Sequence, residues 1–288
     1  MTGRLGVFDS GFGGLTVLAD LMAAMPQTDF LYLGDNARYP YGTRGFDTVL
    51  EFTTEAVDYL FRQGCPVVLL ACNTASAKAL RTIQQQFLPA RWPDRRVLGV
   101  VRPSVEALAE LPPGAIPGVT VPGNATGNVA ILATPGTVAS RSFVMELEKL
   151  APGINVVQQA CPMWVPLVEN GELDGPGCRY FVRKYLEPVL NGPLEISRML
   201  LACTHYPLLL DRISEITPPD VQILTQGRIV AERMVDWLTR HPDFAGRLSS
   251  GGVSWFLTTD DTARFNDLAT MFMTTPVVSE HVHLPRLC

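Results

Sequence analysis

The chain has 288 residues, of which 47% are hydrophobic, and its 23 basic and 28 acidic residues give a net charge of −5. This length and apolar content are enough for about two domains of ~150 residues each. The small negative charge argues against a nucleic-acid or anionic-membrane binder, and the lack of low-complexity sequence argues against a disordered chain.

Apolar, β-branched segments alternate with helical segments along the whole chain, which predicts an α/β fold with doubly wound parallel sheets. The predicted strands are Leu5–Asp9, Phe30–Gly34, Val67–Cys72, Val97–Val101, Val129–Thr134, Ile154–Gln158, Met199–Thr204, Val221–Leu224 and Val253–Thr258. The predicted helices are Gly14–Ala24, Asp47–Gln63, Ala75–Phe87, Ser104–Leu111, Val138–Leu150, Cys178–Leu190, Tyr206–Ile216, Arg228–Thr239 and Thr262–Phe272. The Pro- and Gly-rich stretch 112–127 predicts a loop or linker.

Two short sequences recur at similar separations along the chain. Leu69–Cys72 is repeated as Leu200–Cys203, and Val7–Gly11 has a weaker echo in Leu132–Gly136. Each copy ends a predicted strand, so the repeats predict two similar α/β units related by a pseudo-twofold axis.

No apolar stretch reaches the ~18 residues of a membrane span, and the N-terminal segment lacks the pattern of a signal peptide. The six cysteines contain no CxxC pair. A cytoplasmic protein with reduced thiols is therefore expected.

Parallel sheets bind ligands at the carboxyl ends of their strands, and one cysteine of each unit falls at such an end. A thiol on each side of a cleft suits inversion of a stereocentre, because one thiol can remove a proton while the other returns one to the opposite face. Both Cys72 and Cys203 precede a predicted helix, whose dipole favours a thiolate. His205 and Asp9 are candidates to assist Cys203 and Cys72, respectively.

Other interpretations of these residues are weaker. The remaining cysteines, Cys65, Cys161, Cys178 and Cys288, are expected to be small core residues. The turn that begins at Gly11 has Thr16 where a dinucleotide fingerprint needs its third glycine, so it predicts a site for a small anion instead.

Cofactor and metal signals are also weak. None of the three lysines, Lys78, Lys149 and Lys184, lies where a Schiff-base lysine is expected, so no cofactor is predicted. His281 and His283 are expected to belong to a solvated tail and not to a metal site.

Four motifs occur in an order that resembles the cofactor-independent aspartate/glutamate racemase family, and most closely its glutamate racemases. They are Gly6–Val17, Tyr39–Gly42, Ala71–Ser76 and Ala202–Leu208, with weaker matches at Thr134–Thr137, Cys161–Glu169 and Phe256–Thr259.

The resemblance implies interconversion of L- and D-glutamate, which supplies D-glutamate for peptidoglycan. It implies that Cys72 handles the proton on the D face and Cys203 the proton on the L face, with Asp9, Glu169 and His205 as assisting acids and bases. The substrate-binding positions that it implies are Asp9, Ser10, Tyr41, Gly42, Asn73, Thr74, Thr134, Thr137, Thr204 and His205.

The resemblance also implies two domains with the active site in the cleft between them. Residues 1–98 and 211–288 are expected to form the first domain, and residues 99–210 the second. A homodimer is left open. The chain departs from the family pattern at Arg102, where an acidic residue is common, and at Thr225–Gly227, where Asp-Ser-Gly is common.

Three alternatives remain at this stage. The chain could be a racemase of aspartate or another amino acid, since one methylene changes binding by only ~1–3 kcal/mol. It could be a non-catalytic amino-acid-binding protein, or a decarboxylase that uses one thiol.

Overall fold

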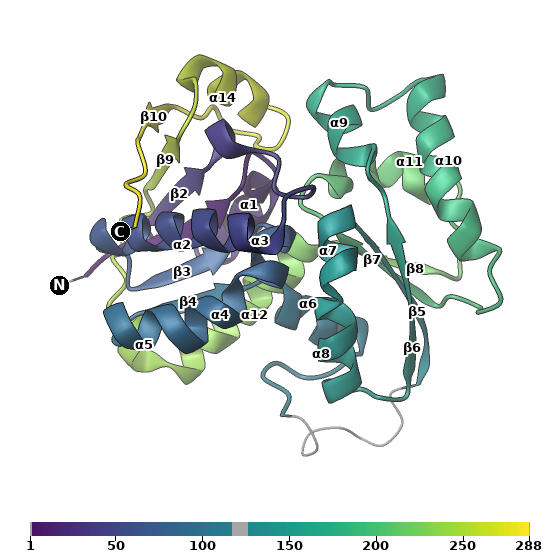
Figure 1. Ribbon diagram of the computed structural model, residues 1–288, viewed down its shortest axis with the longest axis horizontal. Helices are drawn as coiled ribbons and strands as arrows, with labels where there is room; N and C mark the ends of the chain where they lie inside the picture. The colour runs from purple at the N-terminus through teal and green to yellow at the C-terminus, as the bar shows by residue number, and fades with distance from the viewer. Residues whose placement is uncertain (1, 117–125, 288) are drawn as a thin grey trace.

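A computed structural model describes residues 2–116 and 126–287, which fold into two α/β lobes (Figure 1). The strands are β1 (Leu5–Asp9), β2 (Phe30–Gly34), β3 (Val67–Leu70), β4 (Arg96–Gly99), β5 (Gly127–Ala133), β6 (Ile154–Ala160), β7 (Arg198–Ala202), β8 (Gln222–Leu224), β9 (Ser254–Thr258) and β10 (Ser279–His281). The longer helices are α1 (Gly14–Ala24), α2 (Phe46–Arg62), α6 (Val101–Leu108), α8 (Ser142–Leu150), α10 (Pro176–Leu190), α12 (Gln226–Arg240) and α14 (Thr262–Ala269). The shorter helices are η1 (Asn36–Arg38), α3 (Asn73–Lys78), α4 (Leu80–Thr82), η2 (Ile83–Phe87), α5 (Leu88–Arg91), α7 (Pro135–Ser140), α9 (Trp164–Glu169), η3 (Tyr206–Leu209), α11 (Leu210–Ser214) and α13 (Pro242–Ala245).

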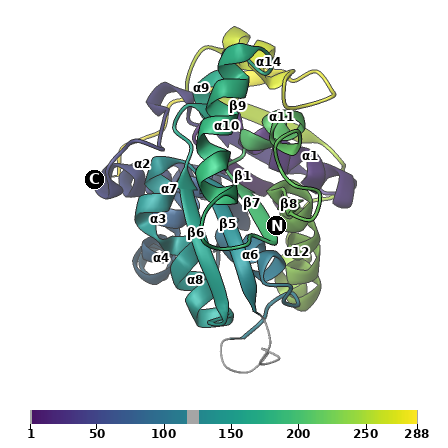
Figure 2. The same cartoon turned by 90° about the vertical axis from the view of Figure 1, so that its right-hand side faces the viewer.

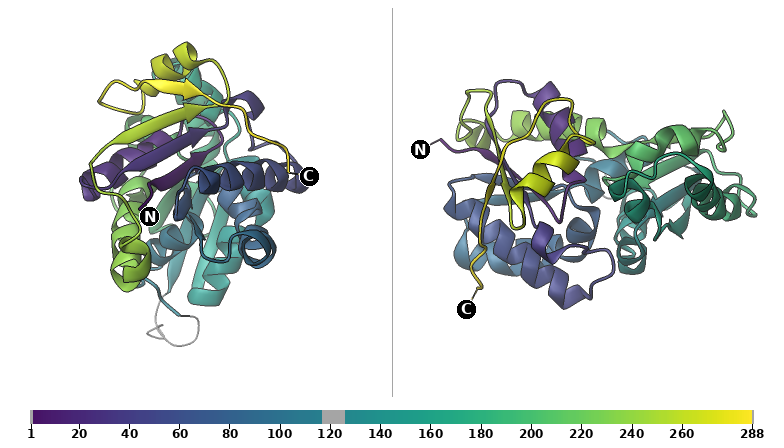
Figure 3. Two further views of the ribbon diagram at one scale, coloured as in Figure 1. Left: turned by 90° about the vertical axis from the view of Figure 1, so that its left-hand side faces the viewer. Right: turned by 90° about the horizontal axis from the view of Figure 1, so that it is seen from above.

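The first lobe is built on a six-stranded parallel sheet in the order β10-β9-β2-β1-β3-β4. Its central strands β1, β2 and β3 are buried throughout, because helices cover both faces (Figure 3). Alternate side chains point to opposite faces, so Phe8 packs in one apolar cluster with Val57 of α2, while Val7 packs in another with Leu18 of α1.

The second lobe is built on a four-stranded parallel sheet in the order β6-β5-β7-β8. This order repeats that of β2-β1-β3-β4 in the first lobe, with β5 in the place of β1 and β7 in the place of β3. The two sequence echoes fall on those two strand pairs, so the predicted fold of two similar parallel-sheet units is confirmed.

The helices of the second lobe lie on both sides of its sheet (Figure 2). Helices α7 and α8 face the first lobe and contact α3, whereas α10 packs on the opposite side of β6 (Figure 1). Helix α12 joins the lobes, because it packs against α1 of the first and against α6 and β7 of the second.

The strand pairing bears on where the chain passes between the two expected domains. Strand β8 pairs with β7 from Arg198↔Gln222 to Leu200↔Leu224, so the second sheet extends beyond residue 210. Strand β4 likewise ends at Gly99 and pairs with β3. We therefore propose that the chain crosses between the domains after Gly99 and again after Leu224.

Several expected elements differ in detail. The single helix expected over Ala75–Phe87 is divided into α3, α4 and the π-helical turn η2. Strand β10 was not predicted, because Ser279–His281 is polar, yet it pairs with β9. Most of the predicted linker, residues 117–125, lies outside the described residues. In the parts of the chain that the structure describes, no helix combines the length and apolar character needed to cross a bilayer.

Candidate active site

A cavity of about 260 Å³ lies where the carboxyl ends of strands from the two sheets meet. Both Cys72 and Cys203 line it, so the two thiols share one compartment. The other expected site residues on its wall are Asp9, Ser10, Tyr41, Gly42, Asn73, Thr74, Thr134, Glu169, Thr204 and His205. The cavity is smaller than the ~300–1,000 Å³ of drug-sized sites, which suits a small metabolite.

Cys72 follows β3 and is the N-cap residue of α3, where its sulfur accepts a hydrogen bond from the Ala75 N–H at 3.5 Å. The Ser10 hydroxyl lies 3.3 Å from the same sulfur. Burial, together with the negative charge of Asp9, raises the pKa of the Cys72 thiol to about 12. This raised pKa keeps the Cys72 thiol protonated near neutral pH.

Cys203 follows β7 but does not begin an α-helix, contrary to expectation. The next element is the short 3₁₀ helix η3, which starts at Tyr206, and α11 begins only at Leu210. Helix-dipole stabilisation is consequently weaker here than the sequence indicated. The positive charge near Cys203 comes instead from His205.

His205 and Glu169 form a hydrogen-bonded pair beside Cys203, with 2.9 Å between His205 Nε2 and Glu169 Oε1. Burial lowers the pKa of His205, but hydrogen bonds with Cys203 and Glu169 outweigh it and raise that pKa to about 10. The imidazole is therefore charged near neutral pH and lies beside the Cys203 side chain. The two thiols thus have different surroundings despite their equivalent positions.

Asp9 ends β1 and is almost fully buried. Burial raises the pKa of its carboxyl group, although the positive charge of His205 and the N–H groups of Gly11 and Gly14 oppose this shift. One oxygen, Oδ1, accepts a hydrogen bond from Gly11 N at 2.8 Å. The other, Oδ2, is buried and has no hydrogen-bond partner among the described residues. A buried oxygen of this kind is available for a ligand or a proton.

Three threonine hydroxyls connect the two lobes at the cavity. Thr74 Oγ1 lies 3.1 Å from Thr134 Oγ1 and 3.3 Å from Thr137 Oγ1, and the latter two are 3.1 Å apart. Thr134 is also the N-cap of α7. Thr137 does not line the cavity directly but is within hydrogen-bond distance of the other two hydroxyls.

Some site residues were missed from the sequence. The Tyr39 ring stacks on His205 with 6.5 Å between ring centroids, and burial and a hydrogen bond with Glu169 raise its pKa. Tyr39 belongs to the Tyr39–Gly42 motif, in which only Tyr41 and Gly42 were expected to bind the substrate. The Tyr41 hydroxyl donates to Asp35. Cys161, expected to be a core residue, is buried and also lines the cavity.

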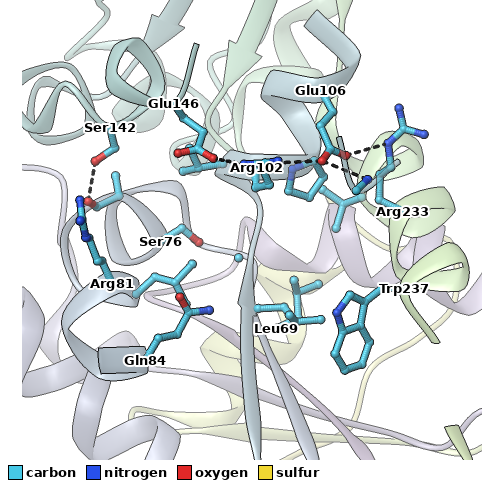
Figure 4. Close-up of a pocket in the computed structure, with 18 of the residues that line it drawn as sticks. Leu69, Ser76, Arg81, Gln84, Arg102, Glu106, Ser142, Glu146, Arg233 and Trp237 are labelled. Carbon is cyan, nitrogen blue, oxygen red and sulfur yellow. Dashed lines mark hydrogen bonds and ion pairs between the residues drawn. The ribbon is translucent and has the colours of Figure 1, made fainter. Parts of the chain in front are cut away.

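A second cavity, of about 470 Å³, also lies between the lobes (Figure 4). Neither Cys72 nor Cys203 lines this second cavity. Arg102 on its wall pairs with Glu106 at 3.0 Å and with Glu146 of α8. Glu106 also pairs with Arg233 of α12 at 3.5 Å. The departure from the family pattern at Arg102 therefore affects the packing of α6, α8 and α12, and not the thiol cavity.

The histidines near the C-terminus lie next to each other at the surface. His281 and His283 are exposed and their rings touch, with 4.5 Å between centroids. Cys288, the third residue considered there, lies outside the described residues. Within residues 2–116 and 126–287, no cluster of three or more His, Cys, Asp or Glu side chains could hold a metal ion.

Comparison with known proteins supplies independent information. The chain is 42% identical over 279 residues to the glutamate racemase of Paracoccus denitrificans, and the aligned region covers 95% of this chain and 97% of that protein. It is 41% identical over 275 residues to the glutamate racemase of Dinoroseobacter shibae, covering 93% and 95%. No family model matches the chain.

Solved structures agree in fold over nearly the whole chain. A glutamate racemase isoform of Bacillus anthracis superposes with a TM-score of 0.84 at 29% identity, covering 98% of each chain. The Francisella tularensis glutamate racemase, solved in complex with D-glutamate, superposes with a TM-score of 0.83 at 28% identity, again covering 98% of each chain.

Proposed function

This chain belongs to the glutamate racemase family of amino-acid racemases, and on that premise we propose that it interconverts L- and D-glutamate with Cys72 and Cys203 as the two bases. The observation that carries the proposal is that both thiols line one small cavity from equivalent positions of the two lobes. Two bases on opposite sides of one carbon are what a direct inversion requires.

The reaction balances with protons alone. In the L-to-D direction, the Cys203 thiolate takes the α-proton of L-glutamate, and the electron pair of the broken C–H bond stays on the α-carbon. The Cys72 thiol then protonates the opposite face and becomes a thiolate. The raised pKa of Cys72 supports this assignment, because it keeps the donor protonated before the reaction.

The reverse direction needs Cys72 as a thiolate, so its proton has to be transferred first. Asp9 interacts electrostatically with Cys72 and has one unpartnered oxygen, which supports a role as the assisting base. His205 and Glu169 assist on the Cys203 side, where the charged imidazole stabilises the thiolate.

The other polar groups of the cavity bind the substrate and stabilise the carbanion. Hydroxyl and amide groups aimed at a site of developing charge lower the barrier to proton abstraction. We assign this work to Asp9, Ser10, Tyr41, Gly42, Asn73, Thr74, Thr134, Thr137, Thr204 and His205, which all lie on the cavity or are bonded to its wall. A turnover of ~10 s⁻¹ requires a barrier of about 16 kcal/mol.

The product defines a role in the cell. D-glutamate is a component of peptidoglycan, so we propose that this protein supplies it for cell-wall synthesis. Two catalytic thiols have to stay reduced, which supports a cytoplasmic site of action.

The test is deuterium incorporation at the α-carbon in D₂O with no added cofactor. L- and D-glutamate should both incorporate deuterium and lose optical rotation, whereas L- and D-aspartate should react much more slowly. Faster reaction of aspartate than of glutamate would show that aspartate is the preferred substrate. Binding of glutamate without exchange would exclude the racemase mechanism, and release of carbon dioxide would indicate a decarboxylase.

A further inference from the structure

Gln226, the first residue of α12, lies at the end of an unusual buried hydrogen-bond cluster. It is only 2% exposed, and its carboxamide pairs with that of Asn73, the residue directly after Cys72. Asn73 Nδ2 donates to Gln226 Oε1 at 2.5 Å, and Gln226 Nε2 donates back to Asn73 Oδ1 at 3.0 Å.

The cluster continues into α6 of the second lobe. Gln226 Nε2 also donates to Ser104 Oγ at 2.7 Å, and the Ser104 hydroxyl donates to the Val100 carbonyl at 2.6 Å. Both amide protons of Gln226 are therefore used. One side chain thus joins α3, α6 and α12 at the junction of the lobes.

The paired amides fix the orientation of Asn73. Rotation of the Asn73 amide by 180° would place two N–H groups, and separately two oxygens, against each other in a buried site, which is strongly unfavourable. Asn73 is on the cavity wall and follows the thiol that caps α3. The position of Cys72 relative to the substrate consequently depends on this pairing.

We propose that Gln226 is a positioning residue for the Cys72 half of the reaction. It holds Asn73, and through it the turn that carries the Cys72 thiol, in the arrangement needed at the α-carbon. Gln226 does not line the cavity and touches no reacting atom. The inference rests on the proposed two-thiol function and adds to it a residue from a distant part of the chain.

The test replaces Gln226 with a side chain of similar shape that cannot form these hydrogen bonds. Gln226→Met should lower kcat/KM about ten- to a hundredfold, because it leaves the buried amide of Asn73 without its partner. Gln222→Met is the matched control, since Gln222 is exposed on β8, and it should retain wild-type rates.

Isotope effects separate positioning from a general loss of structure. With α-deuterated substrates, the isotope effect on kcat/KM should rise for D-glutamate, whose proton Cys72 removes, and should stay the same or fall for L-glutamate. An unchanged rate would overturn the proposal. A lower rate with both isotope effects unchanged would also overturn it, because that pattern only indicates fewer active molecules.

A smaller change keeps the test open if Gln226→Met does not fold. Ser104→Ala removes one of the two acceptors of Gln226 Nε2, and it should shift the same two isotope effects in the same directions by a smaller amount; no shift would contradict the proposal. Failure of the underlying function would look different, because the wild-type protein itself would then show no α-proton exchange.

Discussion

At the scale of single residues, the two thiols occupy equivalent positions but differ in charge environment. Burial and the charge of Asp9 disfavour ionisation of Cys72, and they outweigh the hydrogen bond with the Ser10 hydroxyl, which favours it. Cys203 lies beside His205, whose pKa is raised by hydrogen bonds with Cys203 and Glu169 despite burial. The two cysteines therefore differ in the charges that surround them.

Replacement of either thiol should slow racemisation severely. Cys72→Ser and Cys203→Ser should each lower kcat by about 10²–10⁴-fold, the usual contribution of a positioned acid or base, because a hydroxyl is a far weaker acid than a thiol. The matched control is Cys178→Ser, whose hydroxyl can still donate to the Leu173 carbonyl that Cys178 Sγ bonds at 3.4 Å. Full activity in either active-site variant, measured by polarimetry, would remove that cysteine from the mechanism.

The raised pKa of His205 makes stability depend on pH. Its pKa is about 10 in the folded chain and ~6.5 when unfolded, so its stabilising contribution is complete below pH 6.5 and is lost as the pH rises towards 10. From pH 7 to 8.5, below the ordinary thiol pKa, the free energy of unfolding should fall by up to ~1.4 kcal/mol per pH unit. Urea titrations should show a flatter profile in His205→Gln, and equal slopes would contradict the assignment.

At the scale of elements, the site depends on close approach of loops at the ends of strands. The turn between β1 and α1 meets the turn after β7 at Gly13. A Cβ atom there would lie 2.2 Å from Thr204 Oγ1 and 2.4 Å from His205 Nδ1. The φ angle of Gly13 is −58°, so the constraint is space and not backbone conformation.

Gly13→Ala should therefore damage activity more than stability. The added methyl group displaces His205 from Glu169 and should lower kcat/KM at least about tenfold, because misplacement of reacting groups by ~1 Å costs about that much or more. Gly177→Ala in α10 is the matched control, since nothing lies within 4 Å of its Cβ position. Equal kcat/KM values for the two variants would show that this contact does not matter.

Element types and the location of the site could be predicted from the sequence because both depend on local patterns. Apolar runs indicated nine of the strands, and the cysteines that follow β3 and β7 indicated the edge where the cavity lies. Glu169 followed only from the resemblance.

The contacts of Tyr39 and Gln226 could not be predicted. Gln226 meets Asn73 across 153 residues of chain, and no local spacing encodes that contact. Strand β10 was missed for a related reason, since a polar edge strand has no apolar pattern to indicate it.

At the scale of the whole molecule, two sheets that share the order of four strands each line one side of the same cavity. Groups from both lobes meet in the hydrogen bond between Thr74 and Thr134 at 3.1 Å. A bound dicarboxylic amino acid would contact both lobes and stabilise their closed arrangement.

Glutamate should accordingly stabilise both lobes together. At 100 times its Kd, the free energy of unfolding should rise by ~2.7 kcal/mol. Hydrogen exchange should slow in the turns after β1 and β3 and also in those after β5 and β7, with either enantiomer. L-Lysine, which carries the opposite side-chain charge, is the control. Protection confined to one lobe would contradict a site shared between them.

The measurement that tests the two-thiol account most directly is the location of deuterium early in the reaction in D₂O. Starting from L-glutamate, the D-glutamate formed should carry deuterium at the α-carbon, while the remaining L-glutamate keeps its hydrogen; starting from D-glutamate, the pattern should reverse. Early D-glutamate that retains the original hydrogen would mean that one base removes and returns the same proton, and would contradict the account.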